Sequence, residues 1–143
     1  MATVVAVAFW ALLLSAGILI TLSGNRSAQR FLMAVVGATV LTAAAVVFLP
    51  SATTAYAFLV VDGVLLGTAL YFLLKLDRYW PIWFAGFHSI AVASELSRLA
   101  FSGSVSEMYA NLAGFWSVPA LVAMAWGVSL DRAKQEADPW NNA

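Results

Sequence analysis

The chain has 143 residues, of which 63% are hydrophobic and only 10% are charged, and its formal net charge is zero. Soluble domains are typically about a quarter charged, so this deficit, together with several long apolar runs, places the chain in the membrane class. A neutral chain offers no electrostatic reason to bind nucleic acid, and the absence of cysteine excludes disulfides, iron–sulfur clusters, thiolate nucleophiles and zinc held by cysteine.

The first apolar run covers residues 4–22. A signal peptide would have a basic N-terminal region, a shorter apolar core and a small-residue cleavage site. Here the N-terminal region is uncharged, and two arginines follow the run. We therefore predict a transmembrane helix over 4–22, followed by a polar loop at 23–30 that contains the helix terminators Gly24 and Asn25.

The second and third apolar runs cover residues 31–49 and 55–74, and they are separated by a short uncharged turn. The third run holds Asp62 near its middle, followed by Gly63 and Gly67. Glycines with this GxxxG spacing allow two helices to approach closely. We predict two further transmembrane helices, with a helix contact at the two glycines.

The fourth run, residues 80–100, is apolar overall but carries three ionisable side chains. At about 100° per residue, one stripe of this helix holds groups that lipid cannot solvate, and the opposite stripe holds residues small enough for a close helix contact. The two stripes are Phe84, His88, Ala91, Glu95 and Arg98 on one side, and Gly86, Ser89, Ala93 and Ser97 on the other. We predict that this helix is the centre of the bundle and packs through both stripes.

The fifth run, residues 108–130, carries Asn111 and Pro119, and the proline predicts a kink. The tail over 131–143 has mixed charge and meets a helix stop at Pro139. The fold prediction is therefore an all-α, polytopic membrane protein: one domain over 1–143, built as a compact bundle of five transmembrane helices.

The basic residues predict the orientation of the bundle. The first loop, the third loop and the tail each contain two basic residues, whereas the second and fourth loops contain none. By the positive-inside rule, the N-terminus is expected outside and the C-terminus inside. The predicted location is a bacterial inner membrane.

Three predicted helices bring polar groups to one region in the outer half of the membrane, namely Asp62, Glu95, Arg98 and Asn111, with His88 lying deeper. Charged residues at such depth usually face the interior of a bundle. The cluster has a structural interpretation, in which Arg98 clamps both acids and fixes the packing. It also has a functional interpretation, because two acids and one cation leave one negative charge unbalanced, as a proton or cation site requires.

His88 is open to two similar interpretations. The ring either donates to a backbone carbonyl or polar group on a neighbouring helix, or continues a proton path from Glu95. Catalytic motifs are absent, and a serine protease would need Ser15 or Ser117 beside this histidine. No metal site and no cofactor is predicted.

The small size and the lack of a soluble domain suit an accessory or assembly subunit that contacts the lipid bilayer and packs against itself, as a homo-oligomer, or against a larger membrane protein. A small oligomeric transporter or proton-linked carrier that uses the polar cluster is the alternative, and a membrane enzyme acting on a lipid or quinone is the third possibility. A cavity that reaches Asp62 or Glu95 would favour transport, and a fully satisfied ion cluster would favour the structural role. A lateral apolar groove leading to His88 would favour an enzyme.

Overall fold

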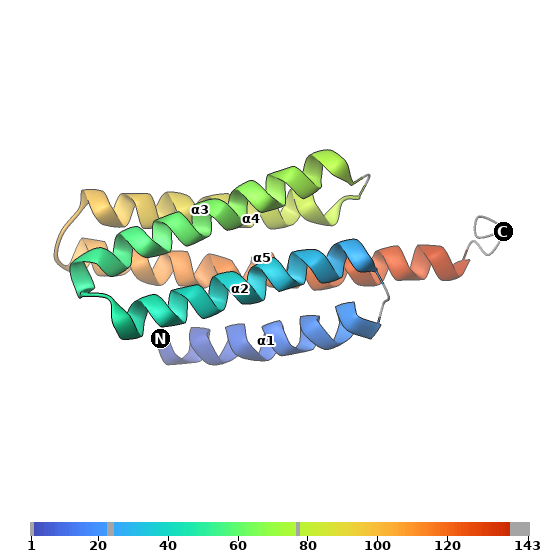
Figure 1. The fold of residues 1–143 in the computed structure, drawn as a ribbon, viewed down its shortest axis with the longest axis horizontal. Coiled ribbons are helices and arrows are strands. Elements are labelled where there is room, and N and C mark those ends of the chain that lie inside the picture. Colours follow the sequence, from blue (N-terminus) through green and yellow to red (C-terminus); the bar gives the residue numbers. More distant parts are fainter. Residues whose placement is uncertain (1, 23–24, 77, 138–143) are drawn as a thin grey trace.

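The described residues form five helices that run alternately in opposite directions along the long axis of the molecule (Figure 1). The computed structural model describes residues 2–22, 25–76 and 78–137, so the predictions made for Gly24 and Pro139 lie outside the described residues. The all-α prediction is confirmed, with helices α1 (Ala2–Leu22), α2 (Arg26–Phe48), α3 (Ser51–Lys75), α4 (Trp80–Ala100) and α5 (Ser104–Ala137).

Three helical segments are long and apolar enough to cross a membrane: Arg26–Phe48, Thr53–Lys75 and Ser104–Lys134. The described part of α1 contains a shorter apolar helix over Val7–Leu22. Helix α4 has 21 residues, as many as α1, but it carries His88, Glu95 and Arg98 and is not among these three segments. The chain is therefore a helical protein with the segments of a membrane protein.

Three helices extend beyond their predicted bounds by four residues or more, and α3 and α5 each begin four residues early, at Ser51 and Ser104. The largest differences are at the start of α2 and the end of α5. Helix α2 begins at Arg26 instead of residue 31, because the Asn25 side chain accepts hydrogen bonds from the backbone N–H groups of Ser27 and Ala28, at 3.1 and 3.2 Å. Helix α5 continues seven residues beyond the predicted end at 130, and Asp131 in this extension pairs with Arg78 at 3.0 Å. Local capping and ion pairing thus lengthen both helices beyond their apolar runs.

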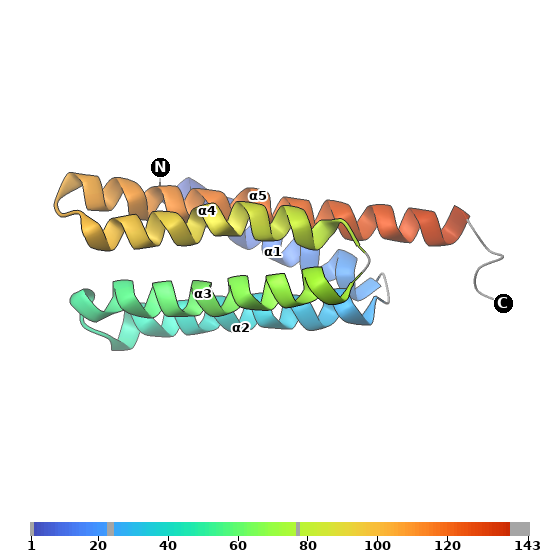
Figure 2. The same ribbon diagram turned by 90° about the horizontal axis from the view of Figure 1, so that it is seen from above.

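The helices form a ring in which each contacts its two neighbours, in the order α1, α5, α4, α3, α2 (Figures 1 and 2). The most extensive contact joins α4 and α5, which are connected by a tight turn where Gly103 has a φ of 65° that favours glycine. A Cβ atom on Gly127 of α5 would overlap the Cβ of Trp80 and lie 3.1 Å from its Cα. Glycine at this position therefore sets the distance between α4 and α5.

The weakest contact in the ring is between α1 and α2. These helices meet where the loop after Leu22 joins them, and they diverge toward the opposite end (Figure 2). The same end of the bundle, where they meet, also holds the α3–α4 loop and the C-terminal part of α5 (Figure 1). We call it the basic end, because it contains Arg26, Arg30, Lys75, Arg78, Arg132 and Lys134.

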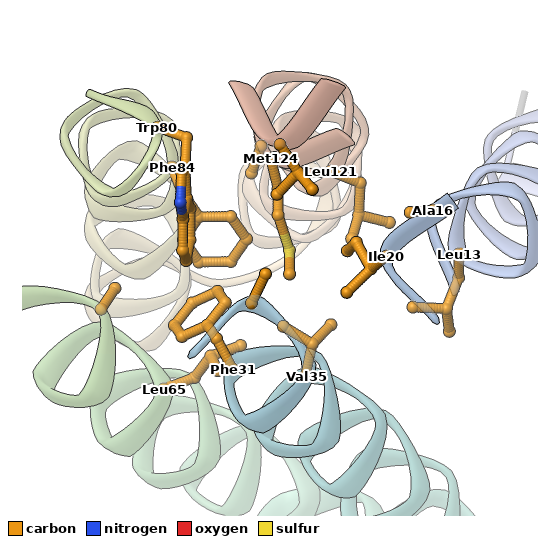
Figure 3. Close-up of a cluster of buried hydrophobic side chains, with 14 of the residues drawn as sticks. Leu13, Ala16, Ile20, Phe31, Val35, Leu65, Trp80, Phe84, Leu121 and Met124 are labelled. Carbon is orange, nitrogen blue, oxygen red and sulfur yellow. The ribbon is translucent and has the colours of Figure 1, made fainter. Parts of the chain in front are cut away.

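The hydrophobic core gathers side chains from all five helices (Figure 3). Phe31 of α2 packs against Trp80 and Phe84 of α4, with ring centroids 5.2 and 4.7 Å apart. Met124 of α5 and Ile20 of α1 complete the cluster and are fully buried. Burial of these large side chains fixes the bundle toward the basic end, and the opposite half is packed less completely.

Candidate functional site

A chamber of about 490 Å³ lies inside the ring, in the half of the bundle away from the basic end. Every helix contributes to its wall, for example through Trp10 of α1, Thr42 of α2, Asp62 of α3, Glu95 of α4 and Ser117 of α5. Ligand pockets in proteins are typically about 300–1,000 Å³, so the chamber has the size of a small-molecule site.

The floor of the chamber is the hydrophobic core. Val35, Leu65, Phe84 and Leu121 belong both to the core cluster and to the chamber wall. The layer that these four residues form separates the chamber from the basic end.

Asp62 of α3 lies in the wall of the chamber. The residue is partly buried, and no described residue forms a hydrogen bond or an ion pair with its side chain. The interpretation in which Arg98 clamps both acids therefore does not fit the described contacts of Asp62. An unpaired carboxylate at such depth is costly unless a ligand, a proton or water satisfies it.

Glu95 is paired, in contrast, although it is the more deeply buried acid, with 5% of its surface exposed. Its Oε2 accepts a hydrogen bond from Arg98 Nη1 at 3.3 Å, and no described residue bonds Oε1. The Arg98 guanidinium lies 5.9 Å from the centre of the Phe58 ring, in cation–π contact. Arg98 is thus occupied by a glutamate one turn away on its own helix and by an aromatic ring of α3.

His88 is buried and connects α4 to α3. Its Nε2 donates to the backbone carbonyl of Asp62 at 3.1 Å, and its ring stacks on Phe84. The backbone contact predicted for this histidine is confirmed. Because the hydrogen bond ends on the Asp62 backbone, it fixes the position of the aspartate while leaving its carboxylate free.

The inward stripe of α4 is placed as predicted, because Phe84, His88, Ala91 and Glu95 are buried and Arg98 is partly buried. Asn111 is not part of the cluster. It is exposed on α5, two residues before the buried Ala113, and two residues span about 200° of a helix. The prediction that Asn111 joins the polar groups is therefore wrong.

The small-residue stripes do not form helix contacts in the part of the chain that the structure describes. Gly63 and Gly67 of α3 are exposed, and a Cβ atom on either would meet no neighbouring atom within 4 Å. The stripe of α4 opposite the polar groups is also directed outward, with Gly86, Ser89 and Ala93 exposed and Ser97 partly exposed. Helical periodicity identifies two opposite faces, but α4 packs inward through only one of them.

The chamber presents hydrogen-bond acceptors to a ligand. The hydroxyl groups of Thr39, Thr42 and Ser117 all donate to backbone carbonyls of their own helices. Each hydroxyl can therefore offer a ligand only the lone pairs of its oxygen, as a hydrogen-bond acceptor. The Asp62 carboxylate and one oxygen of Glu95 add further acceptors. A wall of hydrogen-bond acceptors suits a ligand that is a cation or a hydrogen-bond donor, and it disfavours an anion.

Sequence reasoning missed the contribution of α1 and α2 to this site. Trp10, within the first apolar run, lines the chamber. Thr39 and Thr42 are three residues apart, which places both hydroxyls on one face of α2. These two threonines, a polar pair in an apolar helix, are the sequence feature that could have indicated the contribution of α2 to the site.

The described part of the chain supports neither a metal-binding site nor the catalytic serine of a protease. No group of three or more His, Asp or Glu side chains there could hold a metal ion. Ser117 lines the chamber with His88, but its hydroxyl donates to Gly114 on its own helix, at 3.0 Å. Ser15 likewise donates to Ala11. Comparison of the chain with protein-family models, curated proteins and solved structures finds no match.

Proposed function

We propose that the chain crosses a bacterial inner membrane with five helices, its N-terminus outside and its C-terminus in the cytoplasm. Three helices have the length and hydropathy for this, and α1 and α4 run beside them in the same bundle. Six of the seven basic residues lie at the basic end, which supports a cytoplasmic position for that end. The chamber then belongs to the outer half of the membrane.

Within this topology, we propose that the protein is a proton-linked carrier for a small positively charged solute. The observation that carries the proposal is a chamber of about 490 Å³ lined by an acid, Asp62, that has no partner among the described residues. A purely structural ion cluster would have every charge satisfied by protein groups. Here the Asp62 carboxylate, which no described residue satisfies, lines a chamber large enough for a ligand.

The charges of the site support exchange between a cation and a proton. The titratable groups in the chamber wall are Asp62 from α3, and His88 and Glu95 from α4, while α1, α2 and α5 contribute none among their described residues. Arg98 offsets the charge of Glu95, which leaves Asp62 to bind either a cation or a proton. Because both compete for one carboxylate, release of one accompanies binding of the other.

Transport also requires the chamber to open toward the cytoplasm. The floor formed by Val35, Leu65, Phe84 and Leu121 blocks that direction, so the structure corresponds to a state of the proposed carrier that is closed toward the cytoplasm. Opening inward would require the helices to separate at this layer, as in other alternating-access carriers.

Uptake into proteoliposomes tests the carrier proposal. Vesicles with an acidic interior and a membrane potential clamped at zero should accumulate tetramethylammonium or tetraphenylphosphonium in exchange for protons. Asp62→Asn should abolish this uptake, and Asp131→Asn, which changes an acid at the basic end, should retain it. Uptake of neither cation above that of protein-free vesicles would refute the proposal, as would full activity of Asp62→Asn.

The exposed small residues favour a second function, in which the chain assembles with itself or with a larger membrane protein. Gly63 and Gly67 on α3, and Gly86, Ser89 and Ala93 on the neighbouring α4, are exposed within a single chain. Surfaces of this kind allow another membrane helix to approach closely. Gly67→Leu should therefore reduce the oligomer fraction in nanodiscs without unfolding the chain, and an unchanged distribution of oligomers would exclude this surface as a homo-oligomer contact.

A further inference from the structure

We propose that the ligand of the chamber is a lipophilic organic cation, and that it enters sideways from the bilayer, between α1 and α2, past Trp10. This inference rests on the proposed function, and it adds the class of ligand and the route. The route follows from the seam between α1 and α2, and the class of ligand follows from the chamber wall.

The seam between α1 and α2 is the weakest contact of the ring. The helices diverge away from the basic end, toward the half that contains the chamber (Figure 2). On the outer surface of the seam lies a groove of about 510 Å³ lined almost entirely by apolar side chains, including Leu14, Ile18 and Leu32. We call it the seam groove. In the proposed topology, this groove faces the lipid tails.

Trp10 separates the seam groove from the chamber. Its side chain lines both spaces, and half of its surface is exposed. The Trp10 ring packs edge to face against Phe9, which also lines the chamber. Rotation of this one indole would therefore connect the two spaces.

The α2 side of the mouth carries small apolar residues. Ala43 and Val46 line the chamber and are nevertheless exposed, Val46 by 61%. A residue that is both exposed and part of the wall marks the place where the chamber opens. This opening lies along the length of α2, inside an apolar segment that is long enough to cross the membrane. A ligand that uses it must be soluble in lipid.

The wall of the chamber defines the ligand more closely. Asp62 and Glu95 require positive charge or hydrogen-bond donors, and the rings of Phe9, Trp10, Phe58 and Phe84 supply a large apolar and aromatic surface. Aromatic faces attract cations when water is excluded. The volume of about 490 Å³ greatly exceeds the share of one water molecule, about 30 Å³, so a simple inorganic ion would leave most of the chamber empty. An organic cation with an apolar body satisfies both parts of the wall.

Equilibrium binding to the full-length protein in nanodiscs tests the class of ligand. Tetraphenylphosphonium should bind saturably and at least tenfold more tightly than tetramethylammonium, which has the same charge without the aromatic body. Tetraphenylborate, which has nearly the same shape and the opposite charge, should not bind above the level of empty nanodiscs. Tighter binding of tetramethylammonium, or equal binding of the phosphonium and the borate, would overturn the assignment of a lipophilic cation. Failure of both cations to bind would refute the proposed function itself.

Association kinetics test the route. Ala43→Trp narrows the proposed mouth and should slow association of tetraphenylphosphonium by about tenfold or more, while Trp10→Ala should accelerate it. Val40→Trp is the matched control, because Val40 is 60% exposed on the same helix and does not line the chamber. Thermal melting confirms that each variant is folded. Wild-type association rates in both Ala43→Trp and Trp10→Ala, with saturable binding retained, would overturn the route and leave the carrier proposal standing.

Discussion

Two acids share one chamber, and their surroundings assign them different roles. Glu95 is almost fully buried and forms an ion pair with Arg98. Asp62 is only partly buried, and its carboxylate forms no ion pair or hydrogen bond with a described residue. An ion pair within one helix keeps Glu95 and Arg98 together whether or not a ligand is present. Asp62 is therefore the residue whose charge is available to a solute, and Glu95 with Arg98 supports the wall around it.

A double-mutant cycle tests this division. Arg98→Leu and Glu95→Leu should each lower the free energy of unfolding, because each leaves a charge without its partner. Their combination should cost less than the sum, with a coupling of about 0.5–3 kcal/mol. Asp62→Leu combined with Arg98→Leu should be additive within about 0.5 kcal/mol, since the two side chains do not pair. Unfolding in one detergent measures all the variants, and a large coupling between Asp62 and Arg98 would contradict the division.

At the scale of helices, apolar periodicity predicts which segments are helical but not how far they extend or which face packs. The bounds of α4 follow from the sequence, since Pro81 and the Phe101–Gly103 turn bracket it. The start of α2 depends on the Asn25 cap, and residues after 130 in α5 remain helical although they are charged. The outward direction of Gly67 could not be predicted, because GxxxG spacing favours a close helix contact without indicating whether the partner helix belongs to the same chain.

The contact between α4 and α5 depends on a glycine that no sequence motif indicates. Gly127→Ala should destabilise the protein by about 1–3 kcal/mol, because the new Cβ would collide with Trp80 and push the helices apart. Gly114→Ala is the matched control on the same helix, where a Cβ meets nothing within 4 Å, and it should cost no stability. Thermal melting in detergent compares the two variants, and equal melting temperatures would show that α4 and α5 do not approach as described.

In the molecule as a whole, one end of the bundle is more tightly packed than the other. The large buried side chains pack together in one cluster (Figure 3). This cluster lies toward the basic end, and the chamber occupies the other half of the bundle. The sequence alone predicts a polar interior shared by α3, α4 and α5, and the structure brings the polar groups of α3 and α4 to the chamber but leaves Asn111 of α5 exposed. It does not predict the cavity, which exists because α1 and α2 diverge and their side chains leave the space beside Asp62 unfilled.

The orientation of the bundle can be measured directly, since the chain has no natural cysteine. A cysteine at Ser104, in the turn opposite the basic end, should react with a membrane-impermeant maleimide in intact cells. A cysteine at Ser27, beside the basic residues, should react only after the cells are permeabilised. The reverse pattern would place the chamber in the cytoplasmic half of the membrane and contradict the proposed topology.

The dependence of cation binding on pH tests the central claim most directly. Binding of tetraphenylphosphonium to the full-length protein in nanodiscs would be measured by calorimetry between neutral and acidic pH, for the wild type and for Asp62→Asn. A cation binds the carboxylate only after the proton leaves, so wild-type affinity should be highest at neutral pH and fall as the pH decreases. Loss of the charge in Asp62→Asn should weaken binding at neutral pH by roughly 10- to 100-fold, the equivalent of about 1.5–3 kcal/mol for a charged contact, and remove the pH dependence. Equal affinity across this pH range, with wild-type binding by Asp62→Asn, would contradict the claim that Asp62 exchanges a cation for a proton.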